Sequence, residues 1–223
     1  MRKNLLLVLL MFFSPAQAQS SQEHWRLLIS GDYHGDEAPT KPGIGWLALI
    51  PLGGVWRLEP ALVRAKPVFD VVLDAKGQTT GIQITSNRAD AIALLRFQNV
   101  KPGKVDTPSM TFKDTPRSVS SGDPPLHIPF KGEQYLIQAD KGRVYLHLRQ
   151  SKTQLPDLLA ADGDNENSAS LLWAGDLDGD GRLDLLFAYN GNNRAGVCLY
   201  LSAAAAAEGE LVQRAACHGG IGC

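Results

Sequence analysis

A short acidic segment near the C-terminal end carries the strongest chemical signal in this 223-residue sequence. Aspartates stand at positions 1, 3, 5 and 9 of the run that begins at Asp176, and Gly181 occupies position 6. Four carboxylates this close repel one another unless a cation lies among them, and Ca²⁺ accepts about six to eight oxygen ligands in a tolerant geometry. Because glycine allows a sharp turn, Gly181 would let the backbone carbonyl of Arg182 face the same ion.

The segment therefore predicts a Ca²⁺ site. Its expected ligands share one loop and are Asp176, Asp178, Asp180, Arg182 (through its carbonyl) and Asp184. Further oxygens would come from water or from flanking polar residues, namely Asp162, Asp164, Glu166 and Asn190. We expect an affinity of about 10⁻⁴–10⁻³ M, as in extracellular calcium modules. The alternative is an Asp- and Gly-rich turn whose charges are simply solvated.

The same residues resemble the D-x-D-x-D-G-x-x-D calcium loop of FG-GAP/VCBS-type repeats, in which one strand enters the loop and an apolar strand leaves it. Here Leu171–Ala174 enters and Leu185–Phe187 leaves, so the resemblance covers residues 171–190. It implies the ligand roles given above. A single copy cannot form a propeller built from one repeat per blade. The segment is also similar to the start of an EF-hand, but Phe187 stands where that family has a bidentate glutamate.

Other residues offer weaker chemistry. Asp32, His34 and Asp36 form a D-x-H-x-D pattern that could bind a transition metal, although acidic loops after strands are common. Four tryptophans could stack on sugars if they were exposed in a row, but burial in apolar strands is the favoured interpretation; they are Trp25, Trp46, Trp56 and Trp173. The sequence contains no G-x-S-x-G, P-loop or S-x-x-K motif for nucleophilic or phosphate chemistry.

The first residues have the three-part layout of a secretory signal. Arg2 and Lys3 precede an apolar run over Leu5–Phe13, and Ala16-Gln17-Ala18 has small residues at the positions that a signal peptidase reads. We expect residues 1–18 to be a cleaved signal peptide and the protein to be periplasmic or extracellular. Cleavage removes two basic residues and changes the net charge from −1 to −3. This charge gives no reason to expect a nucleic-acid partner. No later stretch approaches 18 apolar residues, so we expect no membrane insertion of the mature chain.

All three cysteines lie in the last 26 residues, and an exported protein can keep a disulfide. Cys198 lies in an expected strand, and a bond from it to Cys217 or Cys223 would fasten the C-terminal tail. We favour Cys198–Cys223 because the glycine-rich segment before Cys223 is flexible. A local Cys217–Cys223 bond, or none, remains open.

Short alternating apolar runs between Gly, Pro, Asn and Asp predict an all-β protein, built as an antiparallel β-sandwich or two packed sheets. The expected strands are 25–30, 45–50, 54–59, 68–73, 81–85, 91–97, 126–130, 133–139, 143–149, 170–174, 183–189, 195–202 and 210–215. Short helical pieces are expected at 86–93, 153–161 and 202–208. A Pro-rich connection over 102–125 would separate an N-terminal β part, 19–101, from a C-terminal β part, 126–223, unless the two form one continuous domain.

These features favour an exported β-module with a structural Ca²⁺ ion and a non-catalytic binding or cell-envelope role, acting on an unknown protein or glycan partner. The alternatives are a secreted metal-dependent hydrolase of unrecognised type and a carbohydrate-binding module.

Overall fold

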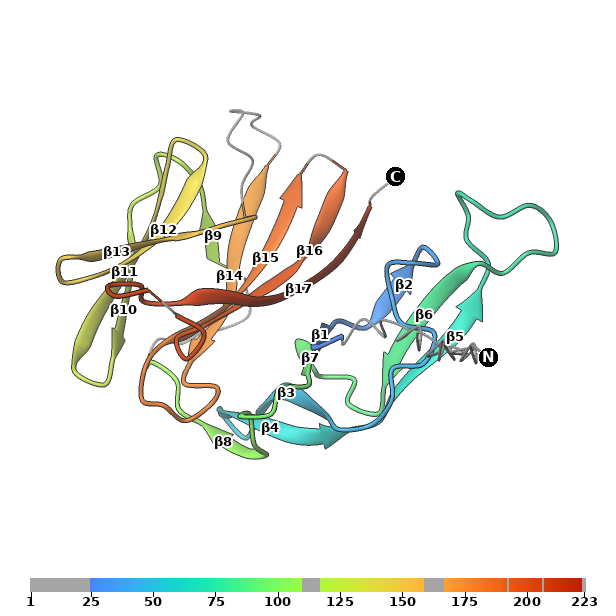
Figure 1. The fold of residues 1–223 in the computed structure, drawn as a ribbon, viewed down its shortest axis with the longest axis horizontal. Coiled ribbons are helices and arrows are strands. Elements are labelled where there is room, and N and C mark those ends of the chain that lie inside the picture. Colours follow the sequence, from blue (N-terminus) through green and yellow to red (C-terminus); the bar gives the residue numbers. More distant parts are fainter. Residues whose placement is uncertain (1–24, 110–116, 159–166, 192, 206, 222–223) are drawn as a thin grey trace, which may run out of the picture.

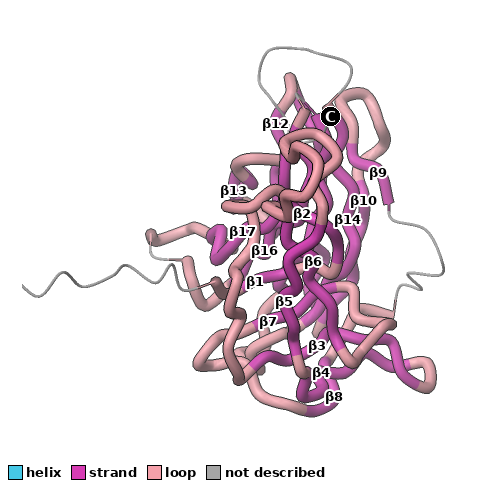
Figure 2. Tube along the Cα trace, turned by 90° about the vertical axis from the view of Figure 1, so that its right-hand side faces the viewer, coloured by secondary structure: helices cyan, strands magenta, loops and turns pink. Residues whose placement is uncertain are grey.

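The computed structural model describes residues 25–109, 117–158, 167–191, 193–205 and 207–221, which contain strands and loops and no helix (Figure 2). The predicted signal peptide lies outside these residues. The strands are β1 (Leu27–Leu28), β2 (Gly31–Tyr33), β3 (Trp46–Leu52), β4 (Val55–Ala61), β5 (Val63–Val68), β6 (Gly81–Ser86), β7 (Ala93–Leu95), β8 (Gly103–Val105), β9 (Arg117–Val119), β10 (Leu126–Phe130), β11 (Glu133–Asp140), β12 (Arg143–Leu148), β13 (Ser151–Leu155), β14 (Ser168–Gly175), β15 (Asp184–Gly191), β16 (Arg194–Leu201) and β17 (Gln213–Ile221).

The strands form four antiparallel sheets (Figure 1). Sheet I has the order β1-β7-β3-β4-β8, and sheet II has the order β2-β6-β5. Sheet III is the meander β10-β11-β12-β13, and sheet IV has the order β17-β16-β15-β14-β9. The predicted all-β class is confirmed, and none of the described sheets closes into a barrel or a propeller.

Sheet IV is apolar on both faces and therefore packs between two other sheets. Leu171, Phe187 and Tyr200 point to one face, where they join buried residues of sheet III in one core. Trp173 and Leu186 point to the other face, where they meet buried residues of sheet I. A third core fills the space between sheets I and II. Because side chains alternate along a strand, one run of apolar residues can serve two cores.

The clearest strand predictions are confirmed. β10 has the predicted bounds, and in β12 the side chains of Val144 and Leu146 are fully buried on one face. Lys-Gly dipeptides form the turns before β11 and β12, with positive φ at Lys131 (46°) and Lys141 (48°). Positive φ at both central residues matches the twist of a two-residue hairpin.

The three helical predictions are wrong for the described residues. Ser86 ends β6, Ala93 begins β7, and residues 87–92 between them form turns and bends. Residues 153–155 belong to β13, and the described residues of 202–208 form turns. Alanine-rich segments this short gain too few helical hydrogen bonds to nucleate a helix by themselves.

The predicted strand 68–73 is also wrong beyond its first residue, because the chain leaves β5 at Val68 and enters a turn stabilised by Asp70 and Asp74. The segment predicted as a Pro-rich connection contains two short strands. β8 pairs with β4 in sheet I, and β9 pairs with β14 in sheet IV. No described segment forms a helix long and apolar enough to span a membrane.

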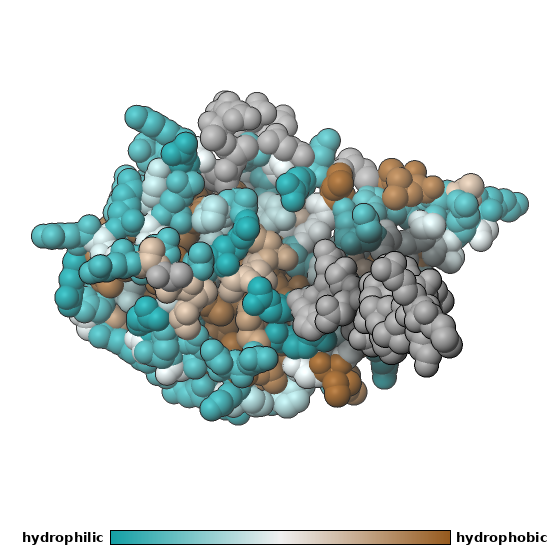
Figure 3. Space-filling model, viewed as in Figure 1, coloured by the Kyte–Doolittle hydropathy of each residue, from teal (hydrophilic) through white to brown (hydrophobic). Residues whose placement is uncertain are grey.

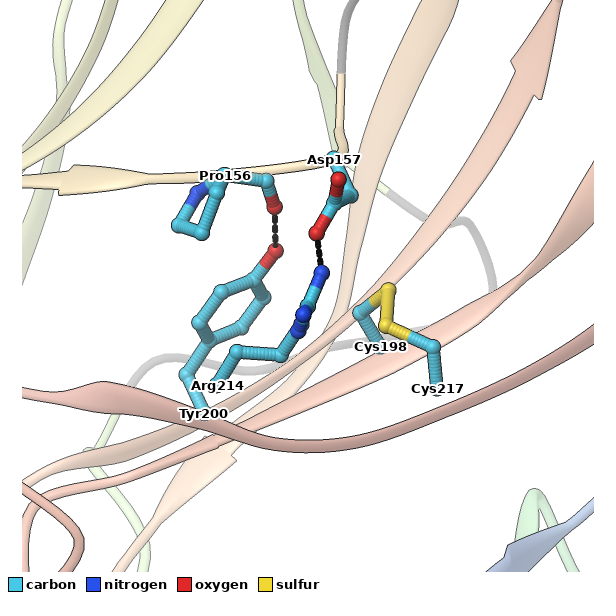
Figure 4. The surroundings of a disulfide bond; sticks show 6 residues. All are labelled: Pro156, Asp157, Cys198, Tyr200, Arg214 and Cys217. Atoms are coloured by element: carbon cyan, nitrogen blue, oxygen red, sulfur yellow. Dashed lines mark hydrogen bonds and ion pairs between the residues drawn. A yellow bond between two sulfur atoms is a disulfide. The ribbon is translucent and has the colours of Figure 1, made fainter.

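The structure contains the disulfide Cys198–Cys217, so the preferred Cys198–Cys223 pairing is wrong (Figure 4). Cys198 and Cys217 are direct cross-strand partners in β16 and β17. The sequence prediction ended the last strand at Ala215 and so missed this register. Nearby, the Tyr200 hydroxyl donates to the Pro156 carbonyl and Arg214 pairs with Asp157, which connects sheet IV to the segment after β13. Cys223 lies outside the described residues.

Candidate metal site

The acidic loop connects β14 to β15, which are neighbouring interior strands of sheet IV. Trp173 and Leu177 anchor its entry in the core shared with sheet I, and Leu183 and Leu185 anchor its exit in the core shared with sheet III. Apolar residues therefore fix both ends of the loop, and the predicted order of strand, acidic loop and apolar strand is present.

Gly175 allows the loop to start against two neighbours. A Cβ atom at this position would lie 2.5 Å from the Asp106 carbonyl oxygen and 2.5 Å from the Trp173 ring. The Asp176 amide donates to that carbonyl at 2.8 Å, so the end of sheet I and the loop are joined by a single bridge. Any larger residue at 175 would push this bridge apart.

The loop backbone folds around the Asp176 carboxylate. Oδ1 accepts from the Gly179 amide at 2.8 Å, and Oδ2 accepts from the Gly181 amide at 2.9 Å. Gly179 and Gly181 have φ values of 81° and 86°, in the left-handed region that favours glycine. The predicted sharp turn at Gly181 is therefore present, and Gly179 makes a second one.

Asp184 closes the loop from the far side and is completely buried. Its Oδ2 accepts from the Leu177 amide at 2.7 Å, and its Oδ1 accepts from both the amide and the hydroxyl of Ser202. Burial raises the pKa of Asp184 to about 7, although these hydrogen bonds act in the opposite direction. Burial and the neighbouring Asp180 also raise the pKa of Asp178. Burial is the larger cause of both shifts, and the neighbouring carboxylates add to it.

Three of the predicted ligands come together. One carboxylate oxygen each from Asp176, Asp178 and Asp184 lies within 4.8 Å of the others, a separation that allows all three to bind one metal ion. Asp180 is not part of this group. Its Oδ2 instead accepts from the Ser202 hydroxyl and pairs with the Arg182 guanidinium at 2.8 Å. The arginine two residues away thus supplies the positive charge for Asp180.

A lysine from another sheet contacts the same group. The Lys131 ammonium, in the turn between β10 and β11, lies 2.7 Å from Asp176 Oδ2 and 3.3 Å from Asp106. These two carboxylates raise the pKa of Lys131. Neither Lys131 nor Ser202 could be found from the sequence, because they lie 45 residues before Asp176 and 18 residues after Asp184. No local spacing marks them.

The sequence also predicted further oxygen ligands in the residues that flank the loop. Asn190 pairs with Ser168 at the other end of the β14–β15 hairpin, whereas Asp184 pairs with Gly175 at the loop end. Because each strand residue adds about 3.3 Å, Asn190 is too far away to bind the same ion. Asp162, Asp164 and Glu166 lie outside the described residues.

The D-x-H-x-D residues are not gathered around a common point. The His34 ring contacts Asp70 instead, with Nδ1 2.5 Å from Oδ2, and Asp32 accepts from Gln83. Among the described residues, Asp176, Asp178 and Asp184 are the one group of acidic, histidine or cysteine side chains close enough to hold a metal.

The tryptophans mostly pack in the cores, which is the interpretation that the sequence favours. Trp46 and Trp173 are 1% and 0% exposed and cannot stack on a ligand. Trp25 is half-buried and lines a surface groove of about 810 Å³, together with Phe97 and Asp178 of the acidic loop.

Comparison of the chain with protein-family models, with curated proteins and with solved structures found no match. The resemblance to the FG-GAP/VCBS calcium loop therefore stays a prediction based on residues 171–190.

Proposed function

We propose that this protein is an exported β-module in which the Asp176–Asp184 loop binds a structural Ca²⁺ ion, and that its role is non-catalytic, in binding or in the cell envelope. The convergence of three carboxylates within 4.8 Å in the β14–β15 loop is the observation that carries the proposal. The Cys198–Cys217 disulfide supports export, because disulfides persist outside the cytosol.

The chemistry of the donors favours Ca²⁺. All the grouped side chains are carboxylates, and hard divalent cations prefer oxygen ligands. The loop has no histidine or cysteine that would select zinc or copper. All three carboxylates accept hydrogen bonds from loop amides, so their positions are fixed, and water can supply the remaining oxygen ligands of a Ca²⁺ ion.

A structural role is favoured over a catalytic one by what surrounds the carboxylates. Asp176 and Asp184 are buried and bonded to backbone amides, and Lys131 contacts Asp176. A catalytic metal keeps an open position beside a base that can move protons. Here the buried carboxylates instead join the loop to Lys131 of sheet III and to Ser202, which follows β16.

Thermal unfolding in EDTA, in Ca²⁺ and in Mg²⁺ tests this proposal. With a dissociation constant of about 10⁻⁴–10⁻³ M, about 10 mM Ca²⁺ should stabilise the fold by about 1.4–2.7 kcal/mol, or about 3–10 °C. Asp178→Asn should abolish the gain, and the exposed Asp90→Asn should keep it. Equal melting temperatures in EDTA and in Ca²⁺ would contradict a structural role for calcium.

A carbohydrate-binding role is the second candidate, and the groove next to the metal loop favours it. Trp25 and Phe97 offer ring surfaces, Gln98 and Asn99 offer amides, and Asp178 lies in the same groove. Aromatic and amide side chains together suit sugar rings and hydroxyls. A glycan array in Ca²⁺ should then show binding that Trp25→Ala removes and Trp56→Ala keeps; equal signals from both variants would exclude this groove.

A further inference from the structure

A second pocket, of about 410 Å³, lies among three segments that are distant in the sequence. They are the start of the β5–β6 loop, the segment from Asp32 to Glu37, and the C-terminal end of β17 with the adjacent Ala195. None of its lining residues belongs to the metal loop. The apolar lining consists of Val68, Phe69, Val71, Val72, Ala195 and Ile221.

The rim of this pocket is unusually apolar for a protein surface. Val71 is 85% exposed, Ile221 is 62% exposed, and Phe69 and Val72 are each about half exposed. Figure 3 shows brown, apolar surface over the loop after β5 and at the end of β17. Scattered exposed apolar residues are normal, but a group that rims a hollow marks a binding site.

The loop that presents these side chains is held rigidly. Asp70 is buried, and its Oδ1 accepts from the amides of Val72 and Leu73 at 2.9 and 3.1 Å. Asp74 accepts from the amides of Asp70 and Thr80, both at 2.8 Å. These bonds hold the loop backbone in the conformation that leaves the apolar side chains exposed.

Two carboxylates also connect the walls of the pocket to one another. Asp70, which follows β5, pairs with His34, which follows β2. Glu37 accepts from the Ile221 amide at 2.6 Å and from the His34 amide at 3.0 Å, which fixes the end of β17. A pocket that exists before its ligand arrives loses less conformational entropy on binding.

The charges around the pocket favour a positively charged ligand. Asp32, Glu37 and Asp70 line it, and His34 is the one basic side chain among its lining residues, so the net charge is negative. Asp70 and Glu37 are occupied by the bonds described above. Asp32 is exposed, and in the described residues only its Oδ1 accepts a hydrogen bond, from Gln83 at 2.9 Å. Asp32 is therefore the carboxylate available to a ligand.

We propose that this pocket binds a small amphipathic organic cation, whose apolar chain or ring lies against Phe69, Val72 and Ile221 and whose ammonium group faces Asp32. The volume is within the range of about 300–1,000 Å³ that is usual for small-molecule sites. The negative lining selects the cation, and the apolar rim provides the contact area.

Three eight-carbon probes test the proposal: octylammonium, octanol and octanoate. They have similar apolar chains, and their head groups are positive, neutral and negative, respectively. Binding is followed by NMR shifts of the ¹⁵N-labelled protein at probe concentrations below micelle formation. We expect octylammonium to bind about three- to fivefold more tightly than octanol, with octanoate weakest, and shifts centred on the pocket residues. Equal affinities for the three probes, or shifts spread over the surface, would overturn the proposal.

Variants separate the pocket from general stickiness. Phe69→Ser should weaken octylammonium binding about tenfold, whereas Leu52→Ser, at a residue of nearly equal exposure in the β3–β4 hairpin, should leave it unchanged. Asp32→Asn should remove the preference for the cation over octanol and keep the affinity for octanol. Equal losses from Phe69→Ser and Leu52→Ser would contradict the site. Melting temperatures show that each variant is folded.

Discussion

Two loops of this protein are organised by aspartate side chains, but the carboxylates have different partners. In the β5–β6 loop, Asp70 and Asp74 bond only to donors of the protein, including amides, the Thr80 hydroxyl and His34. In the β14–β15 loop, three carboxylates converge. Within the described parts of the chain, Asp178 accepts only one weak hydrogen bond, from the Asp180 amide at 3.3 Å.

Spacing and burial explain the difference. Asp70 and Asp74 are four residues apart, and each caps its own turn, so their charges are neutralised locally. Asp176, Asp178 and Asp184 are brought together by two glycines with positive φ and by a strand that returns through the core. The first arrangement is complete without an ion, whereas the second gains from one.

The largest difference between the loops should come from Asp184→Ala. It leaves the Leu177 amide and the Ser202 amide and hydroxyl buried without their acceptor, so we expect a loss of about 3–4 kcal/mol in EDTA. Urea unfolding measures it. A loss under about 1 kcal/mol would mean that the buried carboxylate does not organise its loop.

A pH effect of about 2–3 kcal/mol should come from His218, which lies beside the second pocket between Trp25 and Tyr33. Burial lowers the pKa of His218 to about 4, and its Nδ1 accepts from the Ile29 amide. Since the unfolded chain binds this proton at about pH 6.5, the stability is full above that pH and is lost as the pH falls toward 4.

Urea unfolding at pH 7.5 and pH 4.5 measures the stability of His218→Gln and of the natural protein. All other titrating groups are common to both proteins, so the difference between them isolates the effect of His218. Glutamine keeps an acceptor for the Ile29 amide. The natural protein should lose about 2–3 kcal/mol more than the variant on acidification. Parallel losses would show that His218 is protonated in the folded state.

Asp70→Ala should cost less than Asp184→Ala, about 1–2 kcal/mol, because the amides of Val72 and Leu73 can bond to water in the variant. The loss should be the same in EDTA and in Ca²⁺, since Asp70 has no part in metal binding. Unfolding curves in both solutions check this. A loss of stability that depends on Ca²⁺ would contradict this expectation, because it would show that the two loops are energetically coupled.

The smallest effect should be a change in calcium affinity in Lys131→Gln. Removing the ammonium group 2.7 Å from Asp176 Oδ2 eliminates a competing positive charge, so we expect Ca²⁺ to bind about three- to tenfold more tightly. Lys141→Gln is the matched control, because Lys141 has nearly the same φ in the next hairpin. Calorimetric titration measures the Ca²⁺ affinity of both variants. Weaker Ca²⁺ binding in Lys131→Gln would contradict this expectation and show that Lys131 supports metal binding.

Much of the fold could be predicted where alternation and turn residues agree. β10, β11 and β12 follow from runs such as Val144 to Leu148 and from the Lys-Gly turns. The errors arise where contacts distant in the sequence decide. Residues 153–155 join β13 because Val144 and Leu146 in β12 pair with Leu155 and Thr153. Residues 69–73 form a turn because the Asp70 carboxylate accepts from backbone amides of this segment.

The candidate site was predictable to a similar extent. The motif identified Asp176, Asp178 and Asp184 because their spacing is local. It could not show that Arg182 and Ser202 would engage Asp180, or that Lys131 would arrive from sheet III. The same limit applies to the disulfide, since the register of β16 and β17 places Cys217 opposite Cys198.

A crystal structure of the protein grown in about 10 mM CaCl₂ is the most direct test of the calcium proposal, because the anomalous signal locates the ion. We predict one anomalous peak in the β14–β15 loop, with carboxylate oxygens of Asp176, Asp178 and Asp184 at about 2.3–2.6 Å. Well-ordered density for this loop with no peak, and with Lys131 still bonded to Asp176, would contradict the account.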